Sequence, residues 1–245
     1  MRVDTHHHLI PSIDDGCRNL DDVVENLRVM ALAGYTRIFC TPHCLHPEFT
    51  PLPNFKIVEE VERLRRHLAA AEGGAPIEIQ AGGELRLEAD LPERLRATGI
   101  PTFGMAGTHV LVETWEPVWP EWVLQNIEWL QKQGLVVILA HPERLPPIQT
   151  EPELVDRLLR MGVLFQGTLG PIGGEEKQRS AEVAAQFLKE GRYFMVASDA
   201  HRPENLARRL QGLETIRELV GEAALTELTV TNPGKIWDAA MNAQC

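Results

Sequence analysis

Apolar residues are distributed along the chain in two kinds of pattern. Short runs of apolar residues predict buried strands, and longer segments whose apolar residues recur every three or four positions predict amphipathic helices. The expected strands are Arg2–Thr5, Thr36–Cys40, Ile77–Ala81, Val110–Val112, Val136–Ala140, Val163–Gln166 and Tyr193–Ala197. The expected helices are Leu20–Leu32, Asn54–Ala71, Glu121–Gln133, Glu153–Met161, Glu176–Glu190 and Glu204–Val220. This alternation is typical of an α/β fold with a parallel sheet and crossover helices.

Glycines mark the ends of several expected helices, and the next strand follows almost at once. These glycines are Gly34, Gly134, Gly162 and Gly191. A glycine just after a helix is a common stop signal. The short connections favour a closed, barrel-like sheet built from β/α units. The longest irregular stretches are His43–Pro53 and Gly167–Glu175, and in such barrels the loops after the strands carry the chemistry.

The composition is that of a chain able to bury a full core, with 245 residues of which 44% are hydrophobic and 24% are charged. No linker or low-complexity segment divides it, so we expect one domain over residues 1–245. Charged residues interrupt every apolar run long enough to cross a membrane, and the segment MRVDTHHH lacks the apolar core of a secretion signal. We therefore expect a cytoplasmic protein that is not inserted in a membrane.

The four cysteines are Cys17, Cys40, Cys44 and Cys245, and no two of them form a CxxC pair. Few thiols in a chain of this length indicate reduced cysteines and no disulfide framework. Cys40 and Cys44 flank His43, which leaves a cysteine-ligated zinc site as an alternative. Cys40 ends an apolar run, so a buried small hydrophobic residue is the preferred interpretation.

The net charge of -11 argues against nucleic acid as a partner, because binding its backbone requires clustered Lys and Arg. An anionic substrate would need positive charge at the site itself. Bound metal ions are one source of such charge.

Histidines and carboxylates recur at one place in the β/α units, just after the expected strands. The residues concerned are His6, His8, His43, Glu84, Glu113, His141, Asp199 and His201. If the strands are parallel, these side chains all converge on one rim of the barrel. Side chains without a common function would be scattered over helices and loops instead.

Two of these pairs have a spacing of two residues. In His6-His7-His8 the alternation of a strand directs His6 and His8 to the same side and His7 away. Asp199-Ala200-His201 repeats this spacing after the apolar run FMVA. Alone, an HxH pair is also compatible with a polar strand end or a tag remnant. The joint placement of all the pairs favours metal binding.

A mixed set of imidazole and carboxylate ligands suits Mn, Fe or Zn better than Mg or Ca. At roughly four to six ligands per ion, including water, the set exceeds the needs of one ion. The sequence therefore predicts two or three divalent transition-metal ions with at least one bridging carboxylate. Ligand type does not separate Mn from Fe or Zn, and we take Mn as the first choice.

Several motifs resemble the PHP (polymerase and histidinol phosphatase) superfamily of metal-dependent phosphoesterases: DTHHH at 4–8, TPH at 41–43, HPER at 141–144 and SDAH at 198–201. A further set is similar to the bacterial CpsB/CapC-type tyrosine phosphatases: HLIPSIDDG at 8–16, GGEL at 82–85, LVE at 111–113 and NPGKI at 232–236. Enzymes of that type act on phosphotyrosines of kinases that govern capsule and exopolysaccharide synthesis. The resemblance covers essentially the whole chain.

The resemblance implies a distorted (β/α)7, TIM-like barrel of the PHP type with three metal ions. Matching motif positions imply three ligand sets: His6, His8, Glu84 and Asp199; Glu84, Glu113 and His141; and Asp15, His43 and His201. Glu84 would then bridge two ions. The family pattern favours Asp15 over Asp14 as the ligand and gives Asp14 a supporting or turn role.

Arg144, in HPER, matches the phosphate-binding arginine of the family, and a planar guanidinium fits two phosphoryl oxygens. The alternative is a surface ion pair of Arg144 with Glu143. For a second arginine the candidates are Arg202, next to His201, and Arg208. We retain Arg202 as the weaker substrate-binding candidate.

The expected chemistry is metal-assisted hydrolysis of a phosphotyrosine. A cysteine nucleophile requires an arginine six positions later, but Val23, His46 and Thr50 occupy those positions after Cys17, Cys40 and Cys44. We instead expect a hydroxide that bridges two ions to attack phosphorus, while the metals and Arg144 neutralise the phosphoryl oxygens. The expected partner is a phosphotyrosine protein, such as a bacterial tyrosine kinase of polysaccharide synthesis.

Two other functions remain open at this point. One is hydrolysis of a small phosphomonoester such as histidinol phosphate, and the other is a non-catalytic interaction module. The oligomeric state is not predicted.

His46 and His67 are interpreted as solvated residues outside the ligand set. Three tryptophans after Glu113 either form a lip for an aromatic phosphoester or anchor the next helix, with core packing preferred: Trp115, Trp119 and Trp122.

Overall fold

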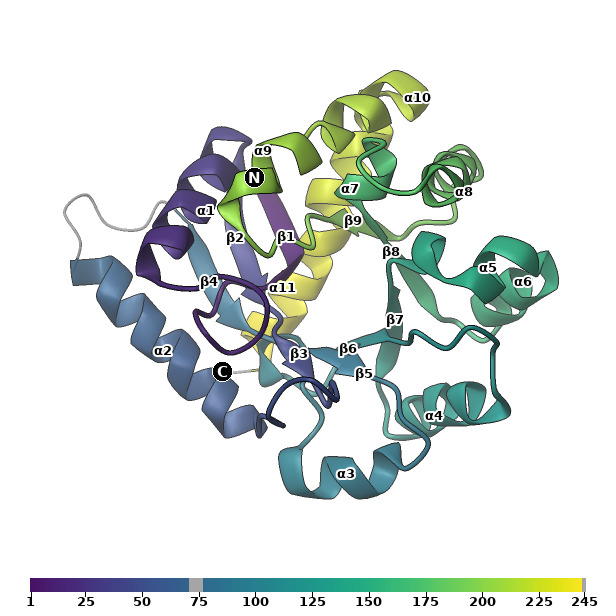
Figure 1. Ribbon diagram of the computed structural model, residues 1–245, viewed down its shortest axis with the longest axis horizontal. Helices are drawn as coiled ribbons and strands as arrows, with labels where there is room; N and C mark the ends of the chain where they lie inside the picture. Colours follow the sequence, from purple (N-terminus) through teal and green to yellow (C-terminus); the bar gives the residue numbers. More distant parts are fainter. Residues whose placement is uncertain (71–76, 244–245) are drawn as a thin grey trace.

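The computed structural model describes residues 1–70 and 77–243. Its strands follow one another around a ring, and most of the helices lie outside that ring (Figure 1). The strands are β1 (Arg2–His7), β2 (Tyr35–Cys40), β3 (His43–Cys44), β4 (Glu78–Ala81), β5 (Glu84–Arg86), β6 (His109–Glu113), β7 (Val136–Ala140), β8 (Leu164–Thr168) and β9 (Met195–Ala197). The predicted α/β class is confirmed.

All strand pairs within the two sheets are parallel. One sheet has the order β1-β2-β4 and the other β3-β5-β6-β7-β8-β9. Two hydrogen bonds connect β1 to the segment after β9: Asp199 N–H donates to His6 O at 2.9 Å, and His8 N–H donates to Ala200 O at 2.9 Å. The two sheets thus follow one another around a ring, an arrangement compatible with the distorted barrel that the family resemblance implies.

The second and third expected strands are confirmed as β2 and β4, and each is followed by a short strand that was not predicted. Pro42 separates β2 from β3, because proline cannot donate to a strand partner. Gly82 and Gly83 separate β4 from β5. A Cβ on Gly83 would lie 2.7 Å from Cys44 Sγ, so the chain passes too closely there for any other residue.

The predicted helices are largely confirmed, with shifts of one or two residues at most of their ends. Asn19 caps α1, since its side chain accepts a hydrogen bond from Asp22 N–H at 3.0 Å. The helices are α1 (Leu20–Leu32), α2 (Asn54–Ala70), α3 (Leu91–Thr98), α4 (Glu121–Lys132), α5 (Pro146–Thr150), α6 (Pro152–Arg160), α7 (Leu169–Ile172), α8 (Gln178–Lys189), α9 (Pro203–Arg209), α10 (Gly212–Thr226) and α11 (Asn232–Asn242), with the short turns η1 (Phe103–Met105), η2 (Pro142–Arg144) and η3 (Glu227–Thr231).

Three predictions on these elements need correction or fall outside the description. The single helix expected over Glu204–Val220 is wrong, because α9 ends at Arg209 and α10 begins at Gly212. The loop expected over Gly167–Glu175 is wrong, because β8 and α7 occupy most of it. The end of the second helix at Ala71 lies outside the described residues.

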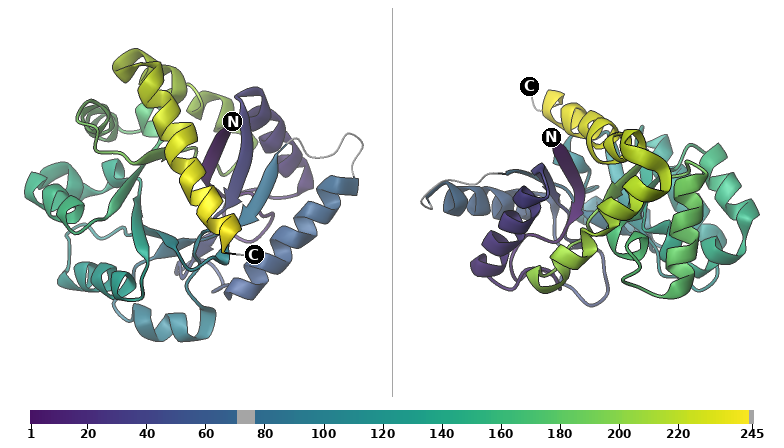
Figure 2. Two further views of the ribbon diagram at one scale, coloured as in Figure 1. Left: turned by 180° about the vertical axis from the view of Figure 1, so that it is seen from behind. Right: turned by 90° about the horizontal axis from the view of Figure 1, so that it is seen from above.

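An apolar cluster fills the inside of the ring and leaves only one end of it for polar chemistry. Its members come from β1, β2, β6, β7, β9, η1 and α11: Val3, Phe39, Phe103, Leu111, Ile138, Ala140, Met195, Ile236, Trp237 and Ala240. Figure 2 shows α11 crossing the ring on the side from which β1 starts. Trp237 of α11 packs on Phe39, with ring centroids 4.9 Å apart. The carboxyl ends of the strands form the opposite side.

No helix within residues 1–70 and 77–243 is long and apolar enough to cross a membrane.

Candidate metal centre

The nine predicted ligands all lie at or just after the carboxyl ends of strands, on one side of the ring. They form four groups of three or four whose donor atoms are within 4.8 Å of one another: His8, Asp15, His43 and His201; His6, Glu84 and His141; His6, His8 and Asp199; and His43, Glu84 and Glu113. Four residues belong to more than one group, so the donors make one continuous cluster.

His6 and His8 direct their side chains to the same point, as the strand alternation predicts. Their Nε2 atoms are 3.2 Å apart. His6 Nε2 is 3.3 Å from Glu84 Oε2 and 3.4 Å from Asp199 Oδ1. His7 points the other way, and its Nδ1 lies 3.0 Å from Asp4 Oδ2. The imidazoles of His6 and His8 and the carboxylates of Glu84 and Asp199 therefore surround one small space.

The ring of His6 is oriented by a residue that the sequence did not reveal. His6 Nδ1 is 2.8 Å from Gln166 Oε1. The amide nitrogen of Gln166 donates to Gly167 O and to Thr168 Oγ1, which fixes Oε1 as the acceptor toward His6. Nδ1 of His6 then carries a proton, and Nε2 faces the cluster, where it can hold a second proton or a cation. Metal-binding histidines are typically held in this way.

Asp14 orients His8 from behind, which agrees with the supporting role expected for it. Its Oδ2 accepts hydrogen bonds from His8 Nδ1 at 2.7 Å and from His43 N–H at 3.1 Å. Its Oδ1 accepts from Gly16 N–H at 3.0 Å. The side chain of Asp14 is 1% exposed. Both carboxylate oxygens of Asp14 are therefore occupied by hydrogen bonds from other residues. Asp14 holds His8 in place and does not offer a free oxygen to an ion.

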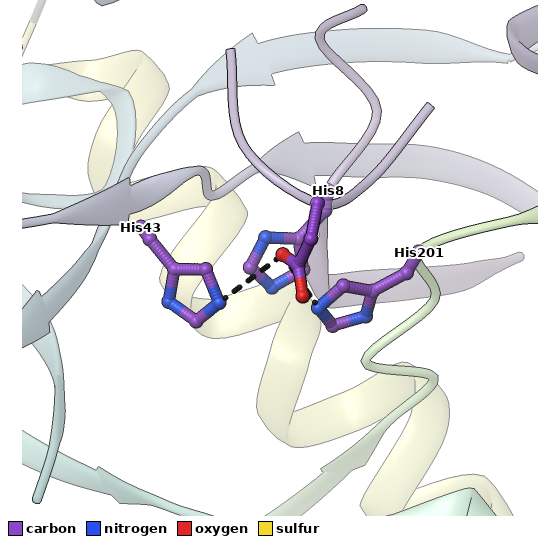
Figure 3. A group of neighbouring side chains, drawn as sticks. His8, His43 and His201 are labelled. Atoms are coloured by element: carbon purple, nitrogen blue, oxygen red, sulfur yellow. Dashed lines mark ion pairs between the residues drawn. The ribbon is translucent and has the colours of Figure 1, made fainter. Parts of the chain in front are cut away.

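Asp15 points into the cluster instead. Its Oδ1 lies 3.5 Å from His43 Nε2 and 3.4 Å from His201 Nε2, the ion pairs drawn as dashed lines in Figure 3. The rings of His8 and His201 stack, with centroids 3.9 Å apart. The side chain of Asp15 is 52% exposed, so this part of the cluster faces the solvent.

Glu84 lies at the centre of the cluster. One oxygen, Oε1, is 2.8 Å from His141 Nε2, and the other, Oε2, is 3.0 Å from His43 Nδ1. His43 Nδ1 is also 3.2 Å from Glu113 Oε1. The two oxygens of Glu84 therefore face different histidines, so one carboxylate connects two parts of the cluster.

Buried histidines and carboxylates of the cluster, such as His6 and Asp199, stay charged because each has groups of opposite charge beside it. Burial disfavours the charged imidazolium of His6, but Glu84 and Asp199 raise its pKa above the ordinary value. Burial likewise opposes ionisation of Asp199, but Arg144 and His6 hold the pKa of that carboxyl well below its usual range. Protons on the histidines therefore compensate the carboxylates, and a cation that replaces those protons would do the same.

The donor set fits bound metal ions. Nitrogen and oxygen donors lie 2.8 to 3.6 Å from one another, the spacing expected of ligands around a shared centre. His141 and Asp199 both have positive φ, 36° and 49°. Non-glycine residues adopt this region at a cost, and such strain is concentrated at functional sites.

Arg144 lines the same cleft as the cluster. The cleft has a volume of about 200 Å³ and is bordered by Asp15, His43, His46, Glu84, Trp115, His141, Arg144, Asp199 and His201. Arg144 Nη1 is 2.5 Å from Asp199 Oδ2, and Nε donates to Glu176 Oε2 at 2.9 Å. It does not pair with Glu143, whose buried carboxyl accepts from Tyr193 OH and Thr168 N–H.

The weaker arginine candidate lies elsewhere. Arg202 is exposed at the start of α9 and is not among the residues that line the cleft. Arg209, which the sequence analysis did not consider, reaches the site from the end of the same helix. Its Nη1 donates to the backbone oxygens of Ser198 and Asp199. Only the fold shows which arginine of α9 faces inward.

The tryptophans after Glu113 have different roles. Trp119 and Trp122 pack against the core, as preferred, whereas Trp115 is 43% exposed and lines the cleft. His46 lines it as well, while His67 is exposed on α2.

The described cysteines take no part in the cluster. Cys17, Cys40 and Cys44 are free and buried, and no metal-capable group among the described residues includes one. Burial raises the pKa of Cys17 to about 12, so its thiol stays protonated. Cys245 lies outside the described residues.

The fold and the site together define a class of protein: an α/β barrel with a centre for several metal ions at the carboxyl ends of its strands. Within this class the chain belongs to the CpsB/CapC family of capsular polysaccharide synthesis, whose model matches residues 2–238.

Comparisons with individual proteins are consistent with membership of this family. The chain is 26% identical over 199 residues to the tyrosine-protein phosphatase YwqE of Bacillus subtilis, covering 81% of this chain and 77% of the relative. It is 28% identical over 222 residues to the tyrosine-protein phosphatase CpsB of Streptococcus agalactiae, covering 84% and 86%. A crystal structure from work on YwqE of Bacillus subtilis and CpsB of Streptococcus pneumoniae, described as metal-dependent tyrosine phosphatases, superposes with a TM-score of 0.86. It has 24% sequence identity, and the match covers 97% of this chain and 94% of that one, which confirms the fold.

Proposed function

We propose that the chain is a metal-dependent protein-tyrosine phosphatase, a phosphoric monoester hydrolase. The observation that carries the proposal is the continuous cluster of nine His, Asp and Glu side chains beside Arg144 in one cleft. The two relatives described above are named tyrosine-protein phosphatases, and they align with most of this chain.

The proposal assigns the donors to three ions. The sets are those that the family resemblance implies: His6, His8, Glu84 and Asp199; Glu84, Glu113 and His141; and Asp15, His43 and His201. The groups of neighbouring donors in the structure differ in the second set, where His141 lies with His6 and Glu84, and Glu113 lies with His43 and Glu84. The separation of 2.8 Å between His141 Nε2 and Glu84 Oε1 and that of 3.4 Å between His201 Nε2 and Asp15 Oδ1 support this division. Mn is the first choice, and Fe or Zn suit the same donors.

When bound, such ions would activate a water molecule and neutralise charge on the phosphoryl oxygens. The protein contributes the orientation of the donors: Gln166 and Asp14 hold His6 and His8 with their Nε2 atoms toward the cluster. Arg144 presents its guanidinium at the cleft, where it can exchange its contacts with Glu176 and Asp199 for two phosphoryl oxygens. The phenolate that leaves, with a parent pKa of about 10, needs less help from an acid than an alkoxide.

The proposal extends to the partner and the compartment. Because the family is one of capsular polysaccharide synthesis, we propose a phosphotyrosine-bearing kinase of that pathway as the substrate. The free, buried thiols of Cys17, Cys40 and Cys44 support a reducing cytoplasm. Because ligands from residue 6 to residue 201 meet in one site, we propose a single domain.

The test begins with protein purified without chelator. We expect bound transition metal by elemental analysis and hydrolysis of a phosphotyrosine peptide that is lost on chelation and restored by Mn. The variant His6→Ala should lose most of the metal and activity. The variant His67→Ala is the matched control, because His67 is exposed on α2, where its Nδ1 lies 2.9 Å from Arg63 O in the same helix.

Two results would count against the proposal. If the metal-free protein or His6→Ala keeps full activity, the metal centre is not catalytic. If histidinol phosphate is preferred over the phosphotyrosine peptide by orders of magnitude in kcat/KM, the substrate class is wrong.

A further inference from the structure

Trp115 is a large apolar side chain held at the edge of the cleft. It follows Glu113, the last residue of β6, by two positions and remains 43% exposed. The cleft that it lines also contains Arg144 and the ligand cluster. Its neighbours Trp119 and Trp122 pack against the core instead. Core packing therefore does not account for the position of this indole, which lies beside the charged groups of the cleft.

Two contacts fix the orientation of the indole. Its Nε1 donates a hydrogen bond to Glu113 Oε2. Its ring stacks on that of His141, with centroids 5.2 Å apart and an angle of 27° between the planes. The polar edge of Trp115 is therefore satisfied inside the site, and one face is covered by His141. The accessible part of the ring is apolar and held in place in advance.

The rest of the cleft is polar. Of the nine described residues that line it, Trp115 is the one with a hydrocarbon surface, and the others carry carboxylates, imidazoles or a guanidinium. Among them, His46 belongs to an aromatic group with His43 and Phe49, whose ring centroids lie 4.9 and 5.0 Å from that of His46. A substrate that places a phosphoryl group at Arg144 thus finds a flat apolar surface nearby.

We propose that Trp115 is a specificity-determining residue that receives the aromatic ring of a phosphoester against its exposed indole surface. The inference rests on the proposed function, because it assumes that the phosphoryl group occupies the cluster and Arg144. An aryl group would stack on the indole, whereas the short chain of a phosphoserine offers no comparable surface. The preference for aromatic phosphoesters then has two sources: the contact of the ring with Trp115, and the ease with which a phenolate leaves.

Binding of two phosphonates that cannot be hydrolysed separates ring recognition from catalysis. We would measure the Kd of phenylphosphonate and of methylphosphonate by calorimetry with metal-loaded protein. In Trp115→Leu the preference for the phenyl compound should fall by about three- to tenfold, the range for one aromatic pair. Trp115→Phe keeps a ring and should retain most of the preference. Metal content is measured in every variant, because Trp115 touches Glu113.

Trp119→Phe is the matched control. It also removes an indole, and the Nε1 of Trp119 is buried without a hydrogen-bond partner. Its preference should equal that of the unaltered protein. A preference that is unchanged in Trp115→Leu overturns the inference, and so does an equal loss of affinity for both phosphonates. The proposed function has its own readout, since it fails if the protein does not hydrolyse a phosphotyrosine peptide, whatever the phosphonates show.

Discussion

Asp14 and His8 form a hydrogen bond of 2.7 Å between Oδ2 and Nδ1 on the side of His8 that faces away from the donor cluster. The same carboxylate oxygen accepts the backbone N–H of His43, and the other accepts the N–H of Gly16. One buried carboxylate thus sets the orientation of one imidazole and anchors the backbone at a second. Loss of this carboxylate should therefore weaken metal binding, although no proposed ligand is removed.

Asp14→Asn tests this support. An amide has one acceptor oxygen, so at least one of the three N–H groups that now face the carboxylate would face an NH2 group instead. We expect metal affinity to weaken about 10- to 100-fold, the usual cost of removing such a partner. Metal titration monitored by calorimetry would measure it. Asp90→Asn, at an exposed position before α3, is the control. Unaltered metal affinity in Asp14→Asn would contradict the role.

Gly16→Ala tests the loop that carries Asp15. A Cβ at this position would lie 2.2 Å from His8 O and 2.5 Å from His8 Cβ, so the backbone of the loop must move. We expect lower activity, weaker metal binding and a lower Tm. Gly234→Ala is the matched control, because a Cβ there meets nothing within 4 Å and lies in α11. It should stabilise the protein by about 0.5 to 1 kcal/mol. Equal behaviour of the two variants would refute the argument.

Arg144→Lys tests the phosphate-binding role. Lysine keeps the positive charge but loses the planar fork that can hold two phosphoryl oxygens. We expect kcat/KM for a phosphotyrosine peptide to fall about 10- to 100-fold, with a matching rise in the inhibition constant of inorganic phosphate. Arg217→Lys, in an exposed ion pair on α10, is the control. If metal content falls while phosphate inhibition is unaltered, Arg144 serves only to hold Asp199.

The two tyrosines of the chain offer a matched stability test. Tyr193 OH donates to Glu143 Oε2 at 2.9 Å in the interior, whereas Tyr35 OH is buried without a partner. Tyr193→Phe leaves a buried carboxyl oxygen unsatisfied and should lower the free energy of unfolding by about 1 to 3 kcal/mol. Tyr35→Phe should leave that free energy unchanged or raise it slightly. Urea titration measures both, and equal losses would contradict the assignment.

The sequence predicted the ring of strands and the rim of donors because both depend on short-range patterns. The alternation in His6-His7-His8 requires no knowledge of the fold, and the structure confirms it in the 3.2 Å between the two Nε2 atoms. The same holds for the α1 cap at Asn19. Because the strands are parallel, residues that follow different strands lie at the same end of the ring, and no other feature of the fold is needed to predict this.

Other features could not be read from the sequence because they depend on how distant segments meet. Gln166 lies within an apolar strand, and only the register of β8 beside β7 places its amide behind His6. Arg209, at the end of α9, reaches Asp199 O, and the packing of that helix against the site is not visible in the sequence. For Trp115 the sequence left a lip at the site and core packing both open and favoured packing, because exposure is a property of the folded surface.

The hydrogen bonds of His6 and His8 with Asp199 and Ala200 join residues that are synthesised almost two hundred positions apart. While the chain emerges from the ribosome, the early histidines have no partner strand and no late donors beside them. The complete set of proposed ligands exists only after residue 201 has left the exit tunnel and the segment after β9 has docked beside β1. Binding of metal by all nine residues would therefore report that almost the whole chain has been made and folded.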